Sequence, residues 1–320
     1  MPSAAAIEPE KILKELRQLW VQLGQSQDAP GGVLRACAMT LVVVAEADAD
    51  GHDAESAHRT IGVLMHDHPS RAIVVSPRGG GELSARVFSE CWMPFGGQQQ
   101  ICAEGIEIST DAERTDEVAR FLVPLIAPDL PVVLWCRGAR AYRDRSLDPF
   151  FPLAGKIIFD TAGLRYAPSA IEFLRRMRKD GHRVADLAWT RLTGWREAIA
   201  HLLGSSPTGI TAVRIIHSGA DPGTGVIFLA RWIERAVPGV NVLLEPSPAD
   251  AANGAAGLQA VTFEKPGEEI SITYQDSKSL EVRIGEKTYS SPLPELSEEM
   301  LMREEVSILG DDPVFDRVLA

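Results

Sequence analysis

The chain has 320 residues, of which 45% are hydrophobic and 24% are charged, and these proportions are typical of a soluble globular protein with a sizeable core. This composition excludes fibrous and largely disordered proteins, and the length favours two domains. The 32 lysines and arginines stand against 44 aspartates and glutamates, so the net charge is −12 and nucleic acid and anionic membrane surfaces are disfavoured as partners.

The expected location of the protein is the cytoplasm. No stretch approaches the ~18 consecutive apolar residues that cross a bilayer. The first residues, Met-Pro-Ser-Ala-Ala-Ala, lack the basic start and the apolar segment of an export signal. The four cysteines show no Cys-x-x-Cys spacing, so we expect most of them to be buried thiols.

Helices and strands alternate in the first part of the chain. Apolar residues at helical spacing predict an amphipathic helix at Glu10–Leu23 and a second helix at Ala57–Met65, which His68-Pro69 ends. Runs of β-branched residues predict buried strands at Leu41–Ala45 and Arg71–Ser76. A strand, a helix and a strand in this order imply parallel pairing.

A predicted hairpin gives this sheet an antiparallel part. Glu82–Trp92 and Gln99–Ser109 are extended stretches on either side of Pro94–Gly97. Further elements are predicted at Val118–Leu125 (helix), Pro131–Trp135 (strand) and Lys156–Asp160 (strand). We expect the first domain, with a mixed sheet, to cover residues 1–165.

The second predicted domain covers residues 166–320. Helices are predicted at Ile171–Lys179, Trp195–Leu203 and Val226–Val237, and strands at Thr211–Ile216, Val240–Leu244, Leu258–Phe263, Ile270–Tyr274 and Leu280–Ile284. The expected fold class is therefore α/β, with two α/β units whose sheets mix parallel and antiparallel strands. The second unit is expected to end in an antiparallel meander and an acidic helix.

No catalytic or metal-binding constellation is recognisable. His66 and His68 lie two residues apart at a predicted helix end, a spacing at which two imidazoles do not converge on a metal. Ser218 lies in Ile-His-Ser-Gly-Ala, which fails the Gly-x-Ser-x-Gly pattern of hydrolases. We therefore expect no enzyme activity, no metal and no cofactor.

One glycine-rich turn could hold a phosphate. Gly219-Ala-Asp-Pro-Gly-Thr-Gly225 lies between a predicted strand and a predicted helix, where backbone N–H groups and the helix dipole favour anions. It lacks the Lys-Ser/Thr of a P-loop and the third glycine of a dinucleotide fingerprint. The candidate phosphate-binding residues are Gly219, Gly223, Thr224 and Gly225, and an ordinary turn is the alternative.

Two cysteines fall opposite each other in the predicted hairpin. A two-residue turn at Gly96-Gly97 would pair Cys91 with Cys102 as a hydrogen-bonded pair, whose Cα separation of about 5.5 Å permits a disulfide. Pro94 and the glutamines that follow Gly97 disfavour so tight a turn. We expect buried free thiols here, and a redox-active pair is the alternative.

Four segments of the sequence resemble the glucose-6-phosphate dehydrogenase assembly proteins called OpcA. The segments are His68-Pro-Ser-Arg-Ala-Ile-Val-Val75, Gly96-Gly-Gln-Gln-Gln-Ile-Cys-Ala-Glu104, Pro128-Asp-Leu-Pro-Val-Val-Leu-Trp135 with Arg137-Gly138, and Asp186-Leu-Ala-Trp-Thr-Arg-Leu-Thr-Gly-Trp-Arg-Glu197. The resemblance covers about residues 35 to 240. Two positions depart from the family pattern, because Gly194 and Cys136 stand where proline and a second tryptophan are frequent.

This resemblance implies a non-catalytic protein that binds glucose-6-phosphate dehydrogenase and promotes its oligomerisation or activity, at the entry to the oxidative pentose phosphate pathway that supplies NADPH. Interface hot spots are enriched in tryptophan and arginine. The candidate contact residues are therefore Trp135, Arg137, Arg140, Trp195 and Arg196, and the alternative for both tryptophans is a place in the core. The alternative function is a sugar-phosphate or nucleotide-binding α/β enzyme that uses the Gly219–Gly225 turn.

Overall fold

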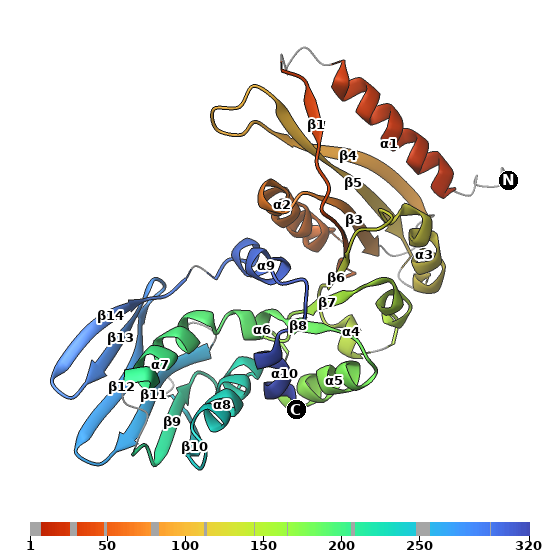
Figure 1. Cartoon of the computed structure of the whole chain (residues 1–320). Helices are drawn as coiled ribbons and strands as arrows, with labels where there is room; N and C mark the ends of the chain where they lie inside the picture. Colours follow the sequence, from red (N-terminus) through yellow and green to blue (C-terminus); the bar gives the residue numbers. More distant parts are fainter. Residues whose placement is uncertain are drawn as a thin grey trace. The chain divides into compact units, whose positions relative to one another are not determined.

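The computed structural model of the chain describes residues 8–25, 31–47, 50–77, 83–111, 114–143, 145–164, 166–205, 209–247, 257–294 and 296–320 (Figure 1). The chain forms two compact units. Unit 1 comprises Met1–Phe159, Gly181–Val184 and Met302–Gly310, and unit 2 comprises Asp160–Asp180, Ala185–Leu301 and Asp311–Ala320. The sequence predicts one change of domain near residue 165, whereas the chain leaves unit 1 after Phe159 and returns to it twice.

Unit 1 is built on a mixed sheet, which confirms the predicted fold class. The strand order is β1-β5-β3-β2-β6-β7-β8, and β4 pairs with β5 in addition. The strands are β1 (Val33–Arg35), β2 (Met39–Val44), β3 (Ser70–Pro77), β4 (Ser84–Trp92), β5 (Gln100–Thr110), β6 (Val132–Cys136), β7 (Lys156–Phe159) and β8 (Val184–Asp186), whose last two residues belong to unit 2. All pairings except that of β4 with β5 are parallel among β1 to β7.

The centre of this sheet explains why the sequence shows continuous apolar runs. Every residue of β2 and β3 is buried, as expected for parallel strands covered on both faces. Strand β2 pairs with β3 along one edge and with β6, which comes later in the chain, along its other edge. The strand order therefore reverses at β2 and β6, which makes this the topological switch point of the sheet.

Helices and short 3₁₀ segments accompany the strands of unit 1. They are α1 (Pro9–Gly24), α2 (His52–Asp67), α3 (Thr115–Leu122), η1 (Val123–Leu125), α4 (Arg140–Arg143) and η2 (Asp148–Leu153). Helix α1 is amphipathic, as predicted: it buries Ile12 and Leu16 and packs against β4 (Figure 1). Helix α2 ends immediately before His68-Pro69, as the proline predicts.

The antiparallel hairpin of β4 and β5 is confirmed, and it has the predicted register. Ser84 lies opposite Ser109 and Cys91 opposite Cys102. The connection, residues 93–99, is longer than a two-residue turn, and Gly96 in it has a φ of +72°, which glycine adopts without strain. Glu82, the predicted start of the first strand, lies outside the described residues.

Unit 2 contains a second sheet, with the order β10-β9-β11-β12-β13-β14. Its strands are β9 (Ala212–His217), β10 (Asn241–Pro246), β11 (Leu258–Lys265), β12 (Glu268–Asp276), β13 (Ser279–Ile284) and β14 (Lys287–Pro292). Strands β9 and β10 are parallel, and β11 to β14 form the predicted antiparallel meander, extended by the unpredicted β14. Instead of one terminal acidic helix, α9 and α10 follow.

The helices of unit 2 pack around an aromatic cluster. They are α5 (Ala167–Lys179), α6 (Leu187–Thr190), α7 (Thr193–Ser205), α8 (Thr224–Ala236) and α10 (Pro313–Leu319), while α9 (Glu298–Val306) runs from unit 2 into unit 1. Trp189 stacks on Phe315 with ring centroids 5.5 Å apart, and Phe228 meets Phe315 edge-on at 5.2 Å. Trp189 also donates its indole N–H to Asp312 at 3.0 Å. In the part of the chain that the structure describes, no helix combines the length and apolarity needed to cross a membrane.

Candidate functional site

Both tryptophans proposed as contact residues are buried. Trp135 lies in β6 between β2 and β7, and 1% of its surface is exposed. Trp195 lies in α7 and is completely buried. Neither ring can meet a partner of the folded chain, so both tryptophans are core residues, the alternative that the sequence left open.

The three predicted contact arginines differ in accessibility. Arg137 is 8% exposed, and its guanidinium lies 4.4 Å from the ring centroid of Trp135. Arg196 is half-buried and lies 3.9 Å from the ring centroid of Trp189. Arg140, the first residue of α4, is also half-buried. Arg140 and Arg196 therefore remain the candidates that a partner could reach.

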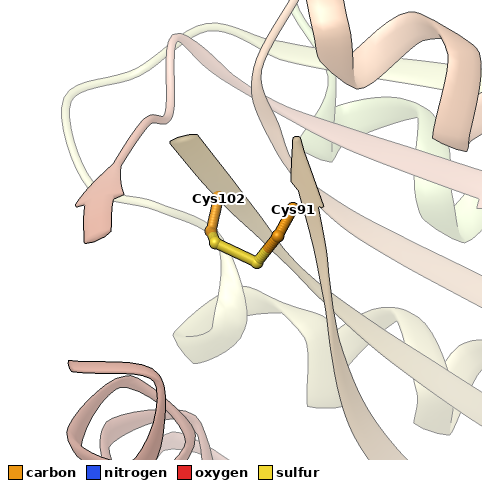
Figure 2. The surroundings of a disulfide bond; sticks show 2 residues. All are labelled: Cys91 and Cys102. Carbon is orange, nitrogen blue, oxygen red and sulfur yellow. A yellow bond between two sulfur atoms is a disulfide. The ribbon is translucent and has the colours of Figure 1, made fainter. Parts of the chain in front are cut away.

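The two hairpin cysteines form a disulfide, so the expectation of free thiols is wrong for this pair (Figure 2). The Cα atoms of Cys91 and Cys102 are 4.1 Å apart, which is typical of a non-hydrogen-bonded pair of antiparallel strands rather than the hydrogen-bonded pair that a two-residue turn would give. The longer connection explains this difference. Cys37 and Cys136 are free, and burial raises the pKa of both thiols.

A buried charge network lies beside this disulfide. Glu104, two residues beyond Cys102 in β5, is 1% exposed and accepts hydrogen bonds from Trp20 of α1 at 2.5 Å and from Arg35 of β1 at 2.7 Å. Arg71 of β3 donates to the same carboxylate at 2.6 Å. One carboxylate thus joins α1, β1 and β3 to the strand that carries Cys102.

The predicted phosphate turn lines a cavity of about 390 Å³ in unit 2. Gly223, Thr224 and Gly225 belong to its wall, whereas Gly219 does not. Gly223 is the N-cap residue of α8 and offers no side chain to the first N–H groups of the helix. The structure therefore brings three of the four predicted residues together at a helix N-terminus, where backbone donors favour an anion.

Arginine charge at this cavity is already compensated. Arg191, which lines the cavity, donates to both carboxylate oxygens of Asp160 at 2.7 Å. Asp221 adds a further carboxylate to the lining. Recognition of an anion would therefore depend on the backbone N–H groups of α8 rather than on an unpaired cation, because the Ser218 hydroxyl donates to the Gly257 carbonyl at 3.3 Å.

Asp186 organises the segments behind the cavity without lining it. Its buried carboxylate accepts hydrogen bonds from the N–H of Thr161 at 3.1 Å, from the Thr161 hydroxyl at 2.6 Å and from the N–H of Ala188 at 2.8 Å. Burial raises the pKa of this carboxyl group to about 7, and the nearby charge of Asp160 adds to the rise against the opposing hydrogen bonds. Asp186 therefore positions the segments around the cavity, because a ligand in the cavity would not touch its carboxylate.

Sequence reasoning missed Asp160, Asp186 and Arg191 as functional candidates. Asp186 and Arg191 lie in the segment Asp186–Glu197, and an aspartate directly before an apolar helical run is a signal for an N-cap. No local pattern pairs Arg191 with Asp160, because 31 residues separate them. Among the described residues, no group of three or more histidines, cysteines, aspartates or glutamates could hold a metal.

Gly194 has no room for a side chain next to the segment that follows β14. A Cβ atom at this position would lie 2.6 Å from Cδ of Pro294 and 2.9 Å from Cδ1 of Leu293. These contacts are too short for any larger residue, proline included, unless the segment after β14 moves. Gly194 thus allows α7 to lie directly against Leu293 and Pro294, which follow the last strand of the meander.

Comparison with known proteins gives matches over most of the chain. Two family models, which describe the N-terminal and the C-terminal domain of a glucose-6-phosphate dehydrogenase subunit, match residues 62–179 and residues 182–319 respectively. A candidate OxPP cycle protein OpcA of Nostoc punctiforme is 23% identical over 174 residues, which are 52% of this chain and 37% of that protein. The chain thus spans little more than a third of the length of this relative.

One further curated protein and one solved structure are also similar to this chain. The pyridoxal 5'-phosphate synthase subunit PdxT of an Arthrobacter strain is 30% identical over 178 residues, which are 54% of this chain and 66% of that protein. A super-repressor mutant of Gal80p from Saccharomyces cerevisiae is similar in structure, with a TM-score of 0.51 and 10% identity over 85% of this chain and 84% of that one. The structural match shows a shared fold and nothing about function.

Proposed function

Because the chain belongs to the family of glucose-6-phosphate dehydrogenase subunits, we propose that it is a non-catalytic protein that binds glucose-6-phosphate dehydrogenase and promotes the assembly or the activity of that enzyme. The observation that carries this proposal is the match of two consecutive domain models of one family to residues 62–179 and 182–319. A cytoplasmic location is part of the same proposal.

The described side chains are consistent with a protein that acts by contact. The two most buried carboxylates are hydrogen-bonded inside the chain, Glu104 to Arg71 and Asp186 to the Thr161 hydroxyl. Paired and hydrogen-bonded groups hold a structure together, whereas catalysis needs a nucleophile or a base that reaches a substrate. We therefore assign the chemistry to the partner enzyme.

Activation by such a protein requires only different affinities for two states of the enzyme. A protein that binds the active or assembled state tenfold more tightly than the other state shifts the equilibrium between them by about 1.4 kcal/mol. The shift needs no chemical step in the activating protein itself. It predicts that the effect saturates when every enzyme protomer has bound its activator.

Association is tested with purified components. The chain and glucose-6-phosphate dehydrogenase are mixed, and the mass of the eluting species is measured by light scattering during gel filtration. A complex heavier than either protein supports the proposal. Independent elution of the two proteins, at concentrations well above those used to measure the activity of the enzyme, contradicts it.

A pair of charge-reversal variants locates the contact. Arg140→Glu in α4 tests one of the two accessible candidate arginines, and Arg235→Glu, at an exposed position of α8, is the matched control. Loss of the complex in the first variant alone would assign Arg140 to the interface. Reversing a charge at an interface mainly slows association and changes its salt dependence, so both are measured.

A second candidate function, binding of a phosphate-bearing ligand, is favoured by the cavity of about 390 Å³ at the N-terminus of α8. Its test is calorimetric titration of the chain with glucose 6-phosphate and with inorganic phosphate. Gly223→Val places a branched side chain at the N-cap, in the wall of the cavity, where no atom other than its chain neighbours now lies within 4 Å of a Cβ position. Saturable binding that this variant abolishes would support the second candidate, and binding that it leaves unchanged would exclude it.

A further inference from the structure

The sheet of unit 1 has a topological switch point, the place at which open α/β sheets commonly bind dinucleotides. In such sheets the ligand lies beyond the carboxyl ends of the strands at the topological switch point. In this chain these ends are Val44 of β2 and Cys136 of β6. A dinucleotide there needs glycines that let its pyrophosphate approach the backbone, and free N–H groups at the start of the helix that follows.

The segment that follows β2 has the wrong composition for this task. Residues 45–51 read Ala-Glu-Ala-Asp-Ala-Asp-Gly, with three carboxylates and a single glycine at the end. Helix α2, which follows, carries two more acidic residues, Asp53 and Glu55, in its first turn. The positive end of the α2 dipole thus already faces its own carboxylates, and a pyrophosphate would meet like charge.

Glu46 fills the space between the two loops. A Cβ atom added to Gly138, just beyond β6, would lie 2.4 Å from Cδ and 2.6 Å from Oε2 of Glu46, so the glutamate side chain is in direct contact with the glycine backbone. The Ala139 N–H donates to Glu46 Oε1 at 3.3 Å. The Ala139 N–H, which could otherwise donate to an anionic ligand, therefore donates to the Glu46 carboxylate.

An ion pair joins the loop after β6 to the start of α2 at the same place. Arg137 Nε lies 2.9 Å from both carboxylate oxygens of Asp53, and Arg137 Nη2 donates to Asp53 Oδ1 at 2.6 Å. Asp53 Oδ2 also accepts the N–H of Glu46 at 2.7 Å. The Arg137 backbone N–H donates to Val44 at 3.0 Å, which continues the β2–β6 pairing past the end of β6.

We infer that Glu46, Asp53 and Arg137 close the switch point of unit 1, so that this chain does not accept a nicotinamide dinucleotide where its fold would place one. The three side chains join the loop after β2, the start of α2 and the loop after β6. A dinucleotide at the switch point would have to lie among these same segments. Arg137 is accordingly a residue of this closure and not a contact residue for a partner. The inference is independent of any association with glucose-6-phosphate dehydrogenase.

Calorimetric titration of the whole chain with NADPH and with NADP⁺, in the absence of any dehydrogenase, tests the closure. We expect no saturable heat up to a ligand concentration of about 1 mM, where even weak specific sites are half-occupied. The chain itself, with its circular dichroism spectrum recorded, is sufficient for this experiment. An absence of saturable binding supports the inference.

If binding is seen, a charge-reversal variant shows where it occurs. Glu46→Arg would attract a pyrophosphate at the switch point, and Glu117→Arg, at an exposed position of α3, is the matched control. If the one site seen in the unmodified chain tightens at least about tenfold in Glu46→Arg alone, with unchanged stoichiometry, the dinucleotide already binds at the switch point and the inference is overturned. A second site that appears only in Glu46→Arg, beside an unchanged first one, shows that Glu46 closes the switch point in the unmodified chain. Binding that is unchanged in both variants lies elsewhere and leaves the switch point closed, as inferred.

Discussion

The ammonium group of Lys156, at the start of β7, donates hydrogen bonds to Glu305 Oε1 at 2.6 Å, to the Glu305 carbonyl at 2.9 Å and to the Ile308 carbonyl at 2.6 Å. The side chains of Lys156 and Glu305 are only 4% and 9% exposed, although 149 residues separate them in the chain. This buried pair holds the segment Met302–Gly310 on unit 1.

Removal of the lysine should strongly destabilise unit 1. In Lys156→Ala the buried carboxylate of Glu305 loses its partner, so we expect the free energy of unfolding to fall by about 3–5 kcal/mol. Arg303→Ala breaks a half-exposed pair with Asp67 in the same unit and should cost less than about 1 kcal/mol. Denaturant unfolding measures both, and equal losses in the two variants would contradict the role of the buried pair.

Phe88 and Gly105 are directly paired across β4 and β5, and the glycine is needed there. A Cβ atom at Gly105 would lie 2.1 Å from Cζ of the Phe88 ring. Gly105→Ala must therefore displace the ring or separate the strands, and we expect a loss of about 1–3 kcal/mol in the free energy of unfolding. The control is Gly24→Ala at the end of α1, where a Cβ atom meets nothing within 4 Å. A neutral Gly105→Ala would show that the ring does not lie on the glycine.

Asp186 should make the stability of the chain depend on pH. Its pKa is raised from 3.8 to about 7 by burial, so the folded state holds a proton that the unfolded state releases between these values. The contribution of the protonated Asp186 carboxyl group to the free energy of unfolding is therefore complete below pH 3.8. It is lost as the pH rises to about 7. At about 1.4 kcal/mol for each pH unit, the loss is on the order of 4 kcal/mol.

Asp186→Asn removes this titration while keeping a side-chain oxygen for the N–H groups of Thr161 and Ala188. We expect the stability of the variant, relative to the unmodified chain, to rise between about pH 4 and pH 7, as followed by denaturant unfolding at several pH values. Asp180→Asn, at an exposed position after α5, is the control and should leave the pH dependence unchanged. Parallel curves for the chain and Asp186→Asn would refute the assignment.

Reduction of the Cys91–Cys102 disulfide should lower the stability of unit 1. A cross-link over a loop of this size stabilises a fold by about 2–4 kcal/mol, mainly by restricting the unfolded chain. The double variant Cys91→Ser/Cys102→Ser should match the reduced chain, and Cys37→Ser, which changes a free thiol, should not. Unfolding with and without reductant, with thiols counted by mass spectrometry, checks this. No change on proven reduction would contradict a stabilising role.

Sequence patterns predict the parts of the fold that depend on local properties. Strands β2 and β3 are predicted because β-branched and other apolar residues follow one another in the sequence, as is typical of strands buried on both faces. Strand β1, with three residues of which two are exposed, and strand β14, which is mostly exposed and polar, carry no such signal. The return of Met302–Gly310 to unit 1 depends on the Lys156–Glu305 contact, which no periodicity can reveal.

The candidate site is predicted less completely than the fold. The turn at Gly223–Gly225 is predicted because its position between strand and helix is a local property. The sequence leaves both an interface and the core open for Trp135, which is buried, because an apolar strand ending in tryptophan has the same sequence whether the ring meets a partner or the core. The pairing of Arg137 with Asp53 spans 84 residues and exists only once β2 and β6 are neighbours.

We propose that this chain changes the behaviour of glucose-6-phosphate dehydrogenase by binding to it. The most direct measurement is the initial rate of NADPH formation by a fixed amount of the purified enzyme, as the chain is titrated in at several glucose 6-phosphate concentrations. We expect a rate that changes with added chain and saturates at a fixed ratio of chain to enzyme, with no NADPH formed by the chain alone. An unchanged rate at saturating chain, or NADPH formation by the chain free of the enzyme, would contradict it.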